Sequence, residues 1–347
     1  MLLYLHIPFC DSKCSYCAFN SYTHLHHRRA RYMTQIVEQF LHDVEELQLP
    51  KAIFRTLFIG GGTPSTVDAA LYERFFEVVR PYLAHDAEIT TEANPNSATL
   101  TWLAQMRVLG VNRLSLGAQS FDEGKLTWLH RAHASHHIDE AVHAAYSAGI
   151  RNISIDLIYG TALDTPALLE RDIERAFVLP ISHLSAYALT IEEHTPFAAT
   201  PQVARESLEM TQKLFEAIDA HGFAQYEISN FGTPSRHNLG YWEYAPYLGI
   251  GAGAVGRIAE HRRYTHTDVD AYIADPLYRT LEHLSPSDMR IEKILLGLRS
   301  RVGVDTALIS DTSRIDALIE EGLAFVENNR LYAKSYLLAD EIALFLE

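Results

Sequence analysis

Short apolar runs rich in β-branched residues alternate with longer amphipathic segments along the chain, and this alternation limits the possible folds more than any other feature. We expect strands at residues 2–9, 56–60, 88–92, 113–118, 152–159 and 183–190. Apolar residues at three- and four-residue intervals predict helices at 29–48, 68–83, 98–109, 136–148, 166–179 and 203–220. Successive βα units predict an α/β fold with a parallel sheet. The periodicity leaves a partial barrel and an open doubly wound sheet equally possible.

The pattern changes after about residue 264, which predicts a large domain at 1–264 and a small one at 265–347. We expect helices at 287–301 and 313–321, a hairpin turning at Asn328-Asn329, and a last helix from Leu338. This order suggests a small winged-helix-like α+β domain. That shape often binds DNA, but acidic residues crowd the segment, so a packing or lid role is the better interpretation.

Composition narrows the function classes. The 347 residues include 44 acidic and 29 basic side chains, for a formal net charge of -15, which opposes binding to phosphate backbones and predicts no nucleic-acid partner. No apolar run reaches 18 residues, so we expect no transmembrane segment. A cytoplasmic location is expected, because a reducing compartment suits unpaired thiolates.

All three cysteines lie in one CxxxCxxC stretch as Cys10, Cys14 and Cys17. An odd number of thiols cannot pair off within the chain, and thiols this close together can bind one soft metal centre. A 4Fe-4S cluster held by three thiolates would leave one iron open to a ligand from outside the protein. A structural zinc site with His6 as the fourth ligand is an alternative, and so are three unrelated thiols.

The residues around these cysteines carry a family resemblance. The segment 7–10, Cys14, the triplet 15–17 and Phe19 resemble the radical S-adenosylmethionine (SAM) superfamily, and more narrowly its oxygen-independent coproporphyrinogen III oxidase-like group. The resemblance implies a partial (β/α)6 barrel, a 4Fe-4S cluster on the three cysteines, and SAM bound to the open iron. Reduced clusters of that superfamily cleave SAM to a 5'-deoxyadenosyl radical.

Several polar or glycine-rich positions follow the expected strands. Three glycines precede Thr63-Pro64, where backbone N-H groups could meet a ligand or simply form a tight turn. Glu92, Gln119 and Asp156 are polar where a buried strand would prefer apolar residues. The resemblance implies SAM contacts at Tyr4, Tyr16, Gly61, Gly62, Thr63, Glu92, Gln119, Arg131, Asp156, Ala188 and Val255. The GxGxxG at 251–256 lacks the flanking pattern of a dinucleotide site, so we expect no nicotinamide cofactor.

Two features separate branches of this group. The oxidases carry a further cysteine two residues after the third, and this chain has Phe19 at that position. This chain also contains the HNxxYW motif, and in both features it resembles the HemW-type haem chaperones. The resemblance implies haem as cargo, with His237 in a loop as axial ligand, Asn238 fixing its tautomer, and Tyr241 and Trp242 packing on the macrocycle. Alternatively His237 caps a loop and the aromatic residues fill core.

We therefore expect a haem chaperone that carries a SAM-coordinated 4Fe-4S cluster and passes haem to apo-haem proteins. Acceptors could include membrane respiratory enzymes, with transient membrane association, and a homodimer is possible. The alternative is oxygen-independent coproporphyrinogen III oxidation by radical decarboxylation of propionates, which the missing cysteine disfavours, and other radical chemistry stays open. The sequence assigns no catalytic residue.

Overall fold

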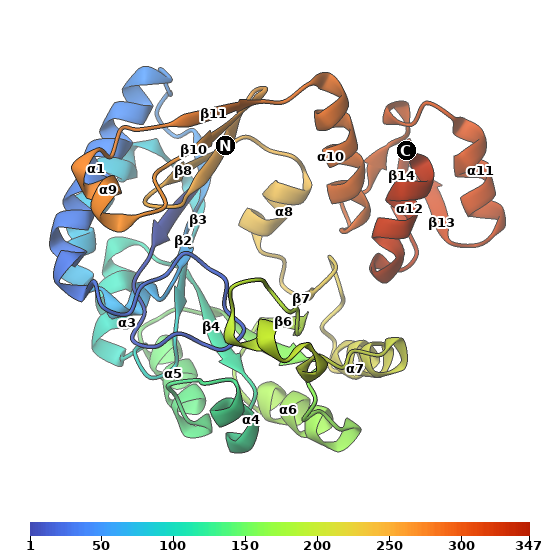
Figure 1. Cartoon of the computed structure of the whole chain (residues 1–347), viewed down its shortest axis with the longest axis horizontal. Coiled ribbons are helices and arrows are strands. Elements are labelled where there is room, and N and C mark those ends of the chain that lie inside the picture. Colours follow the sequence, from blue (N-terminus) through green and yellow to red (C-terminus); the bar gives the residue numbers. More distant parts are fainter.

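Six parallel strands form the centre of an eleven-stranded sheet in the computed structural model, which describes residues 1–347 (Figure 1). These strands pair in chain order, as β1 (Leu2–Ile7), β2 (Phe54–Gly61), β3 (Leu83–Ala93), β4 (Arg113–Gln119), β5 (Asn152–Tyr159) and β6 (His183–Ala188). Parallel pairing brings all six carboxyl ends to one edge, where ligands of such folds collect.

Short strands extend the sheet on both sides. Next to β6 lies antiparallel β7 (Asn230–Gly232), and next to β1 lies parallel β8 (Tyr247–Ile250). Antiparallel β9 (Val255–Ile258), β10 (His261–Tyr264) and β11 (Thr280–His283) complete that side. Because β7 and β11 are free edges, the sheet curves without closing. The α/β fold with a partial barrel, expected from the resemblance, is confirmed.

Helices cover the outer face of the curved sheet (Figure 1). They are α1 (Arg29–Glu46), α2 (Glu73–Val79), α3 (Leu100–Leu109), α5 (Ser135–Ser147), α6 (Pro166–Val178) and α7 (Leu208–Ala220), with α4 (Glu123–Trp128) inserted after β4. Local sequence sets their starts: Thr99, Thr165 and Ser207 each accept a backbone N-H at the first turn, and proline occupies the first position of α6. Each predicted βα unit is present.

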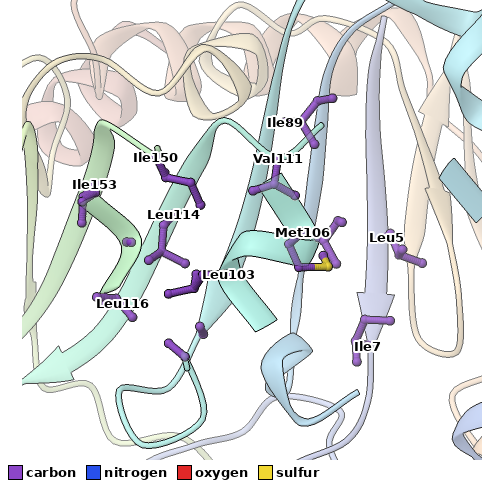
Figure 2. Packing of buried hydrophobic residues seen from close by; sticks show 14 of the residues in the cluster. Leu5, Ile7, Ile89, Leu103, Met106, Val111, Leu114, Leu116, Ile150 and Ile153 are labelled. Atoms are coloured by element: carbon purple, nitrogen blue, oxygen red, sulfur yellow. The ribbon is translucent and has the colours of Figure 1, made fainter. Parts of the chain in front are cut away.

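The main core lies between the sheet and these helices. Alternate residues of each strand point outward, so Leu5 and Ile7 of β1 join a cluster with Leu57 and Ile59 of β2. Figure 2 shows part of this layer, with Leu114 and Leu116 of β4 near Leu103 and Met106 of α3. The intervening strand residues face the inside of the barrel. Many of them are polar, so the inner face is where the chemistry of this fold can be placed.

A smaller unit at the carboxyl terminus has its own core. It contains α10 (Pro286–Leu298), β12 (Val304–Asp305), α11 (Thr312–Glu320), β13 (Ala324–Glu327), β14 (Arg330–Ala333) and α12 (Ala339–Leu346). Asn328 and Asn329 form the hairpin turn between β13 and β14, both with positive φ.

The main sheet continues beyond residue 264, where the sequence pattern predicted a boundary. Strand β11 pairs with β10, and α9 (Val269–Ala274) buries Val269 and Tyr272 in the main core. The separate core begins only with α10. In both units, no helix combines the length and the apolarity needed to cross a membrane.

Candidate functional site

The three cysteines lie in the loop that follows β1. All three are free thiols, with Cys10 and Cys14 buried and Cys17 half-buried. Burial raises the pKa of the Cys10 and Cys17 thiols, so a bound metal would have to displace their protons. A buried loop with three free sulfurs suits a soft metal centre.

The spacing of the sulfurs bears on which metal centre fits. Two thiolates on one tetrahedral zinc ion, each about 2.3 Å away, would lie about 3.8 Å apart. The three Sγ atoms do not all lie within 4.8 Å of one another, so they are spaced more widely than the ligands of one zinc ion would be. Both ring nitrogens of His6 also have hydrogen-bond partners already, because Nδ1 lies 2.9 Å from the Tyr4 hydroxyl and Nε2 lies 2.8 Å from the Asn20 carbonyl. The structural zinc site with His6 therefore does not fit.

Arg131 connects the cysteine loop to the strand ends. Its Nη1 donates to Cys14 Sγ at 3.2 Å and to the Tyr16 hydroxyl at 3.3 Å. Its Nη2 donates to Asn94 Oδ1 at 2.6 Å and to the Gly117 carbonyl at 2.7 Å. The guanidinium thus places a positive charge beside the Cys14 sulfur and ties the cysteine loop to the ends of β3 and β4.

The glycine turn after β2 packs directly on the same loop. A Cβ atom on Gly61, whose φ is +114°, would lie 2.5 Å from the His6 ring, and one on Gly62 would lie 3.0 Å from Cys10 Sγ. Thr63 Oγ1 lies 3.4 Å from that sulfur. The glycines are therefore required for contact with the cysteine loop itself, whichever ligand the turn also meets.

Two buried carboxyl groups face the barrel interior behind this turn. Burial, and then the charge of Asp156, raise the pKa of Glu92 to about 8, although the Gly61 N-H donates to Glu92 Oε2 at 3.0 Å. Burial also raises the pKa of Asp156, which accepts from the Ser115 hydroxyl at 3.3 Å. Neither carboxyl lies within ion-pair distance of a basic side chain, although the charges of Arg113 and Arg131 partly oppose the rise at Asp156. A cationic ligand such as the ammonium or sulfonium of SAM would suit this pair.

The remaining predicted SAM residues divide into two groups. Gln119 ends β4 with φ +70°, and its amide lies with Arg131 around Gly117. Ala188 ends β6 and Val255 begins β9, on opposite sides of the central strands. The structure thus gathers the positions on β1–β5 and the cysteine loop, places Val255 beside Tyr4 in the lining of one cavity, and leaves Ala188 at the far flank.

The GxGxxG segment anchors the cysteine loop. Asn20 donates to the carbonyls of Ala252 and Thr267 at 3.0 and 2.8 Å, and a Cβ on Gly253 would lie 2.5 Å from its amide nitrogen. The segment joins β8 to β9 with no helix after it, which agrees with the rejection of a nicotinamide site. Asn20 and Asn94 were not predicted as site residues, because only their contacts with distant parts of the chain distinguish them from ordinary loop residues.

The HNxxYW motif lies on a short helix, α8 (Arg236–Trp242), rather than in the expected loop. Glu88 of β3 accepts the backbone N-H groups of Arg236 and His237 at 3.1 and 3.0 Å, which holds the start of α8 against the barrel. The loop prediction was wrong because the Ser235 hydroxyl accepts the Asn238 N-H and so caps a helical turn.

His237 is turned inward and is 1% exposed. Its Nδ1 lies 2.7 Å from the Thr56 hydroxyl and its Nε2 lies 3.0 Å from the Tyr241 hydroxyl. Burial, followed by the charges of Arg113 and Arg55, lowers the pKa of His237 to about 3, so its imidazole is neutral. Asn238 and Trp242 are half-buried on the same helix.

A cavity of about 390 Å³ lies between the cysteine loop, β1, α8 and the β8–β9 turn. It is lined by Tyr4, His6, Ala18, Phe19, Asn20, Tyr241, Tyr247, Gly253 and Val255. Phe19 is 68% exposed, more than any other phenylalanine of the chain. The cavity therefore brings predicted SAM residues and one predicted haem residue together beside the cysteines.

Comparison with known proteins agrees with this geometry. The family model described as Radical SAM superfamily matches residues 4–175, which hold the cysteine loop, the glycine turn and both buried carboxyls. Coproporphyrinogen III oxidase (HemN) from Escherichia coli, described as a radical SAM enzyme, superposes with a TM-score of 0.83 at 21% identity, covering 99% of this chain and 89% of that one. Fold and site together define a radical SAM protein.

Curated relatives identify the family within that superfamily. The heme chaperone HemW of Mycobacterium tuberculosis is 32% identical, covering 98% of this chain and 93% of the relative. The protein of the same name from Bacillus subtilis is 32% identical, with coverage of 87% and 84%, and that from Escherichia coli K12 is 36% identical, with 74% and 70%. The chain belongs to the HemW family.

Proposed function

We propose that this protein is a haem chaperone, which binds haem beside its cysteine loop and transfers it to apo-haem proteins. The observation that carries the proposal is the juxtaposition of the HNxxYW helix with the exposed Phe19 in one aromatic-lined cavity, in a chain of the HemW family. An aromatic wall suits a flat apolar macrocycle, and an open cavity suits a carrier that must release its cargo.

The cofactors follow from the superfamily. We propose that Cys10, Cys14 and Cys17 hold a 4Fe-4S cluster and that SAM binds its open iron, where the cluster can supply an electron. Arg131 would hold the Cys14 sulfur in place through its hydrogen bond of 3.2 Å, while the Glu92 and Asp156 carboxyls would attract the cationic parts of SAM. Tyr4, Tyr16, Gly61, Gly62, Thr63, Gln119, Ala188 and Val255 are the further proposed SAM contacts.

The haem contacts are proposed at His237, Asn238, Tyr241 and Trp242. In this arrangement Tyr241 contributes to the cavity wall, while His237 lies behind it. Acceptors are proposed to be apo-haem proteins, including membrane respiratory enzymes reached by transient membrane contact, and a homodimer is a further proposal. We propose that the protein carries out haem transfer in the cytoplasm, because three free thiols need a reducing compartment.

Anaerobic reconstitution tests the function directly. The protein is loaded with iron, sulfide, SAM and haem, then mixed with an apo-haem protein whose recovery of absorbance and activity reports transfer. We expect stoichiometric haem binding and transfer, without formation of protoporphyrinogen from coproporphyrinogen III under reducing conditions. Absence of haem binding by correctly loaded protein would contradict the proposal, and rapid protoporphyrinogen formation would favour the oxidase instead.

A further inference from the structure

Two tyrosine-histidine pairs lie at the cavity beside the cysteine loop, and three of their four side chains line it. In the first, the Tyr4 hydroxyl lies 2.9 Å from His6 Nδ1, and in the second, the Tyr241 hydroxyl lies 3.0 Å from His237 Nε2. Tyr4, His6 and Tyr241 line the cavity, whereas His237 does not. The residue of the HNxxYW motif that can reach a ligand in this cavity is therefore the tyrosine.

His237 has no free nitrogen to offer a metal. Thr56 occupies Nδ1 and Tyr241 occupies Nε2, and the ring is 1% exposed and packed against Phe58, with ring centroids 5.1 Å apart. An iron atom could reach this imidazole only after Tyr241 had moved away. The Tyr241 oxygen, in contrast, belongs to a side chain that already forms the wall, and tyrosine is a known protein ligand of ferric haem.

The two pairs differ in which partner, tyrosine or histidine, can donate the hydrogen bond between them. The Asn20 carbonyl can only accept, so His6 Nε2 carries the proton and the neutral Nδ1 must accept from the Tyr4 hydroxyl. A Tyr4 phenolate would therefore face a nitrogen lone pair, which repels it.

The second pair is free of this restriction. The partner of His237 Nδ1 is the Thr56 hydroxyl, which can donate as well as accept. When Thr56 donates to Nδ1, the neutral imidazole carries its proton on Nε2 and donates it toward Tyr241. A Tyr241 phenolate would then receive a charge-assisted hydrogen bond without requiring a buried imidazolium.

We propose that Tyr241 supplies the oxygen that binds the iron of ferric haem, and that His237 is the positioning residue behind it. This inference rests on the proposed haem-carrying function and deepens it. With hydroxide-bearing ferric haem, the bond from iron to hydroxide breaks and the bond from iron to the Tyr241 oxygen forms. The phenol proton leaves with the hydroxide as water, and the iron stays ferric, so no electron is transferred.

Spectroscopy of the full-length protein loaded with ferric haem tests the assignment. The wild type should show a high-spin ferric signal in electron paramagnetic resonance and the phenolate-to-iron charge-transfer band. Tyr241→Phe should lose both and weaken haem binding by more than about tenfold. His237→Ala should weaken binding by about tenfold while the phenolate band shifts, whereas His237→Gln, which keeps an N-H donor, should retain most of the affinity.

Control variants make the result specific. Tyr146→Phe, on the outer helix α5, should leave the spectrum unchanged, and circular dichroism should show that every variant is folded. An imidazole-type spectrum that survives Tyr241→Phe and disappears in His237→Ala would overturn the assignment, as would loss of the phenolate band in Tyr247→Phe rather than Tyr241→Phe. Wild-type protein that binds no haem at all would instead contradict the proposed function.

Discussion

At the scale of single residues, the site depends on very close approaches between the glycine turn and the cysteine loop. Gly62 has Cys10 Sγ, the Ile7 carbonyl and the Phe9 carbonyl within 3.0 Å of where a Cβ would stand. Two of these three atoms are backbone, which cannot rotate away as the end of a flexible side chain can. The position of Cys10 is therefore sensitive to a single methyl group on the neighbouring turn.

Gly62→Ala should displace the cysteine loop and lower the cluster content of the reconstituted protein by more than half. Iron and acid-labile sulfide per chain, with the visible absorbance of the cluster, measure the effect. Gly222→Ala serves as the control, because no atom lies within 4 Å of the added Cβ, although this glycine has a φ of +84° that strains any other residue. Equal cluster loss in both variants would mean that the clash with the cysteine loop is not responsible.

The Glu92 carboxyl makes the stability of the folded protein depend on pH. Its folded pKa of about 8 lies above its ordinary value of 4.5, so the folded state binds the proton more tightly than the unfolded state does. Between these two values the unfolded chain has lost this proton while the folded chain keeps it, and stability therefore falls as pH rises. Asp156 acts in the same direction, because burial raises its pKa too.

Glu92→Gln should remove this part of the pH dependence. Compared with wild type, the metal-free variant should lose less stability between pH 5 and pH 8, by roughly 3 kcal/mol. Urea unfolding followed by circular dichroism at both pH values measures the difference. Parallel curves for the two proteins would show that the Glu92 carboxyl is not held neutral in the folded state.

At the scale of elements, α8 is held in the barrel by its first turn. Glu88 of β3 accepts two of its backbone N-H groups, and Thr56 of β2 contacts the His237 ring. A seven-residue helix has little stability of its own, so these tertiary contacts determine where the HNxxYW residues lie. The haem segment is in this sense positioned by β2 and β3.

Glu88→Ala should lower the free energy of unfolding by about 2 to 3 kcal/mol, because two helix N-H groups lose a charged acceptor in a buried place. Haem affinity should fall as well, while the cluster content stays at the wild-type value. Denaturant unfolding and haem titration measure the two effects. Arg74→Ala, which removes an exposed ion pair with Glu77 on α2, is the matched surface control. Unchanged haem affinity in Glu88→Ala would separate α8 from the haem site.

At the scale of the whole molecule, the protein has two separate hydrophobic cores, and the seam between them is the short contact region that includes residues 226–228 and 299–301. The small unit buries Ile294, Leu298, Leu318 and other side chains in a cluster separate from the main core. The seam includes backbone hydrogen bonds from Ile228 to Arg299 and from Arg301 to Tyr226, at 2.9 Å each. The small unit therefore abuts the end of the barrel next to β7, away from the cysteine loop (Figure 1).

Leu318→Ala should destabilise the small unit by about 2 to 5 kcal/mol by leaving a cavity in its core. Hydrogen exchange should report loss of protection confined to residues 286–347, with cluster and haem binding unchanged. Leu103→Ala in the main core should instead reduce protection across the barrel. Loss of protection spread over the whole chain in Leu318→Ala would mean that the two cores unfold as one.

The regular part of the molecule was predictable from local sequence. Periodicity located the six βα units, because apolar spacing reports directly which face of an element is buried. The same logic missed α8, α9 and β7–β11, which are short, and whose burial depends on neighbours distant in the chain. The expected boundary at 264 fell too early for this reason, since β11 has no local pattern and belongs to the main sheet through pairing with β10.

The sequence alone determined the thiol inventory of this protein, its α/β class and its family, since these follow from residue identity, spacing and order. Only the tertiary structure decided that Asn20 ties the cysteine loop to the β8–β9 turn, that Arg131 reaches Cys14, and that Tyr241 rather than His237 lines the cavity. The physical reason is that burial and hydrogen-bond direction arise from contacts between distant segments, which no local pattern encodes.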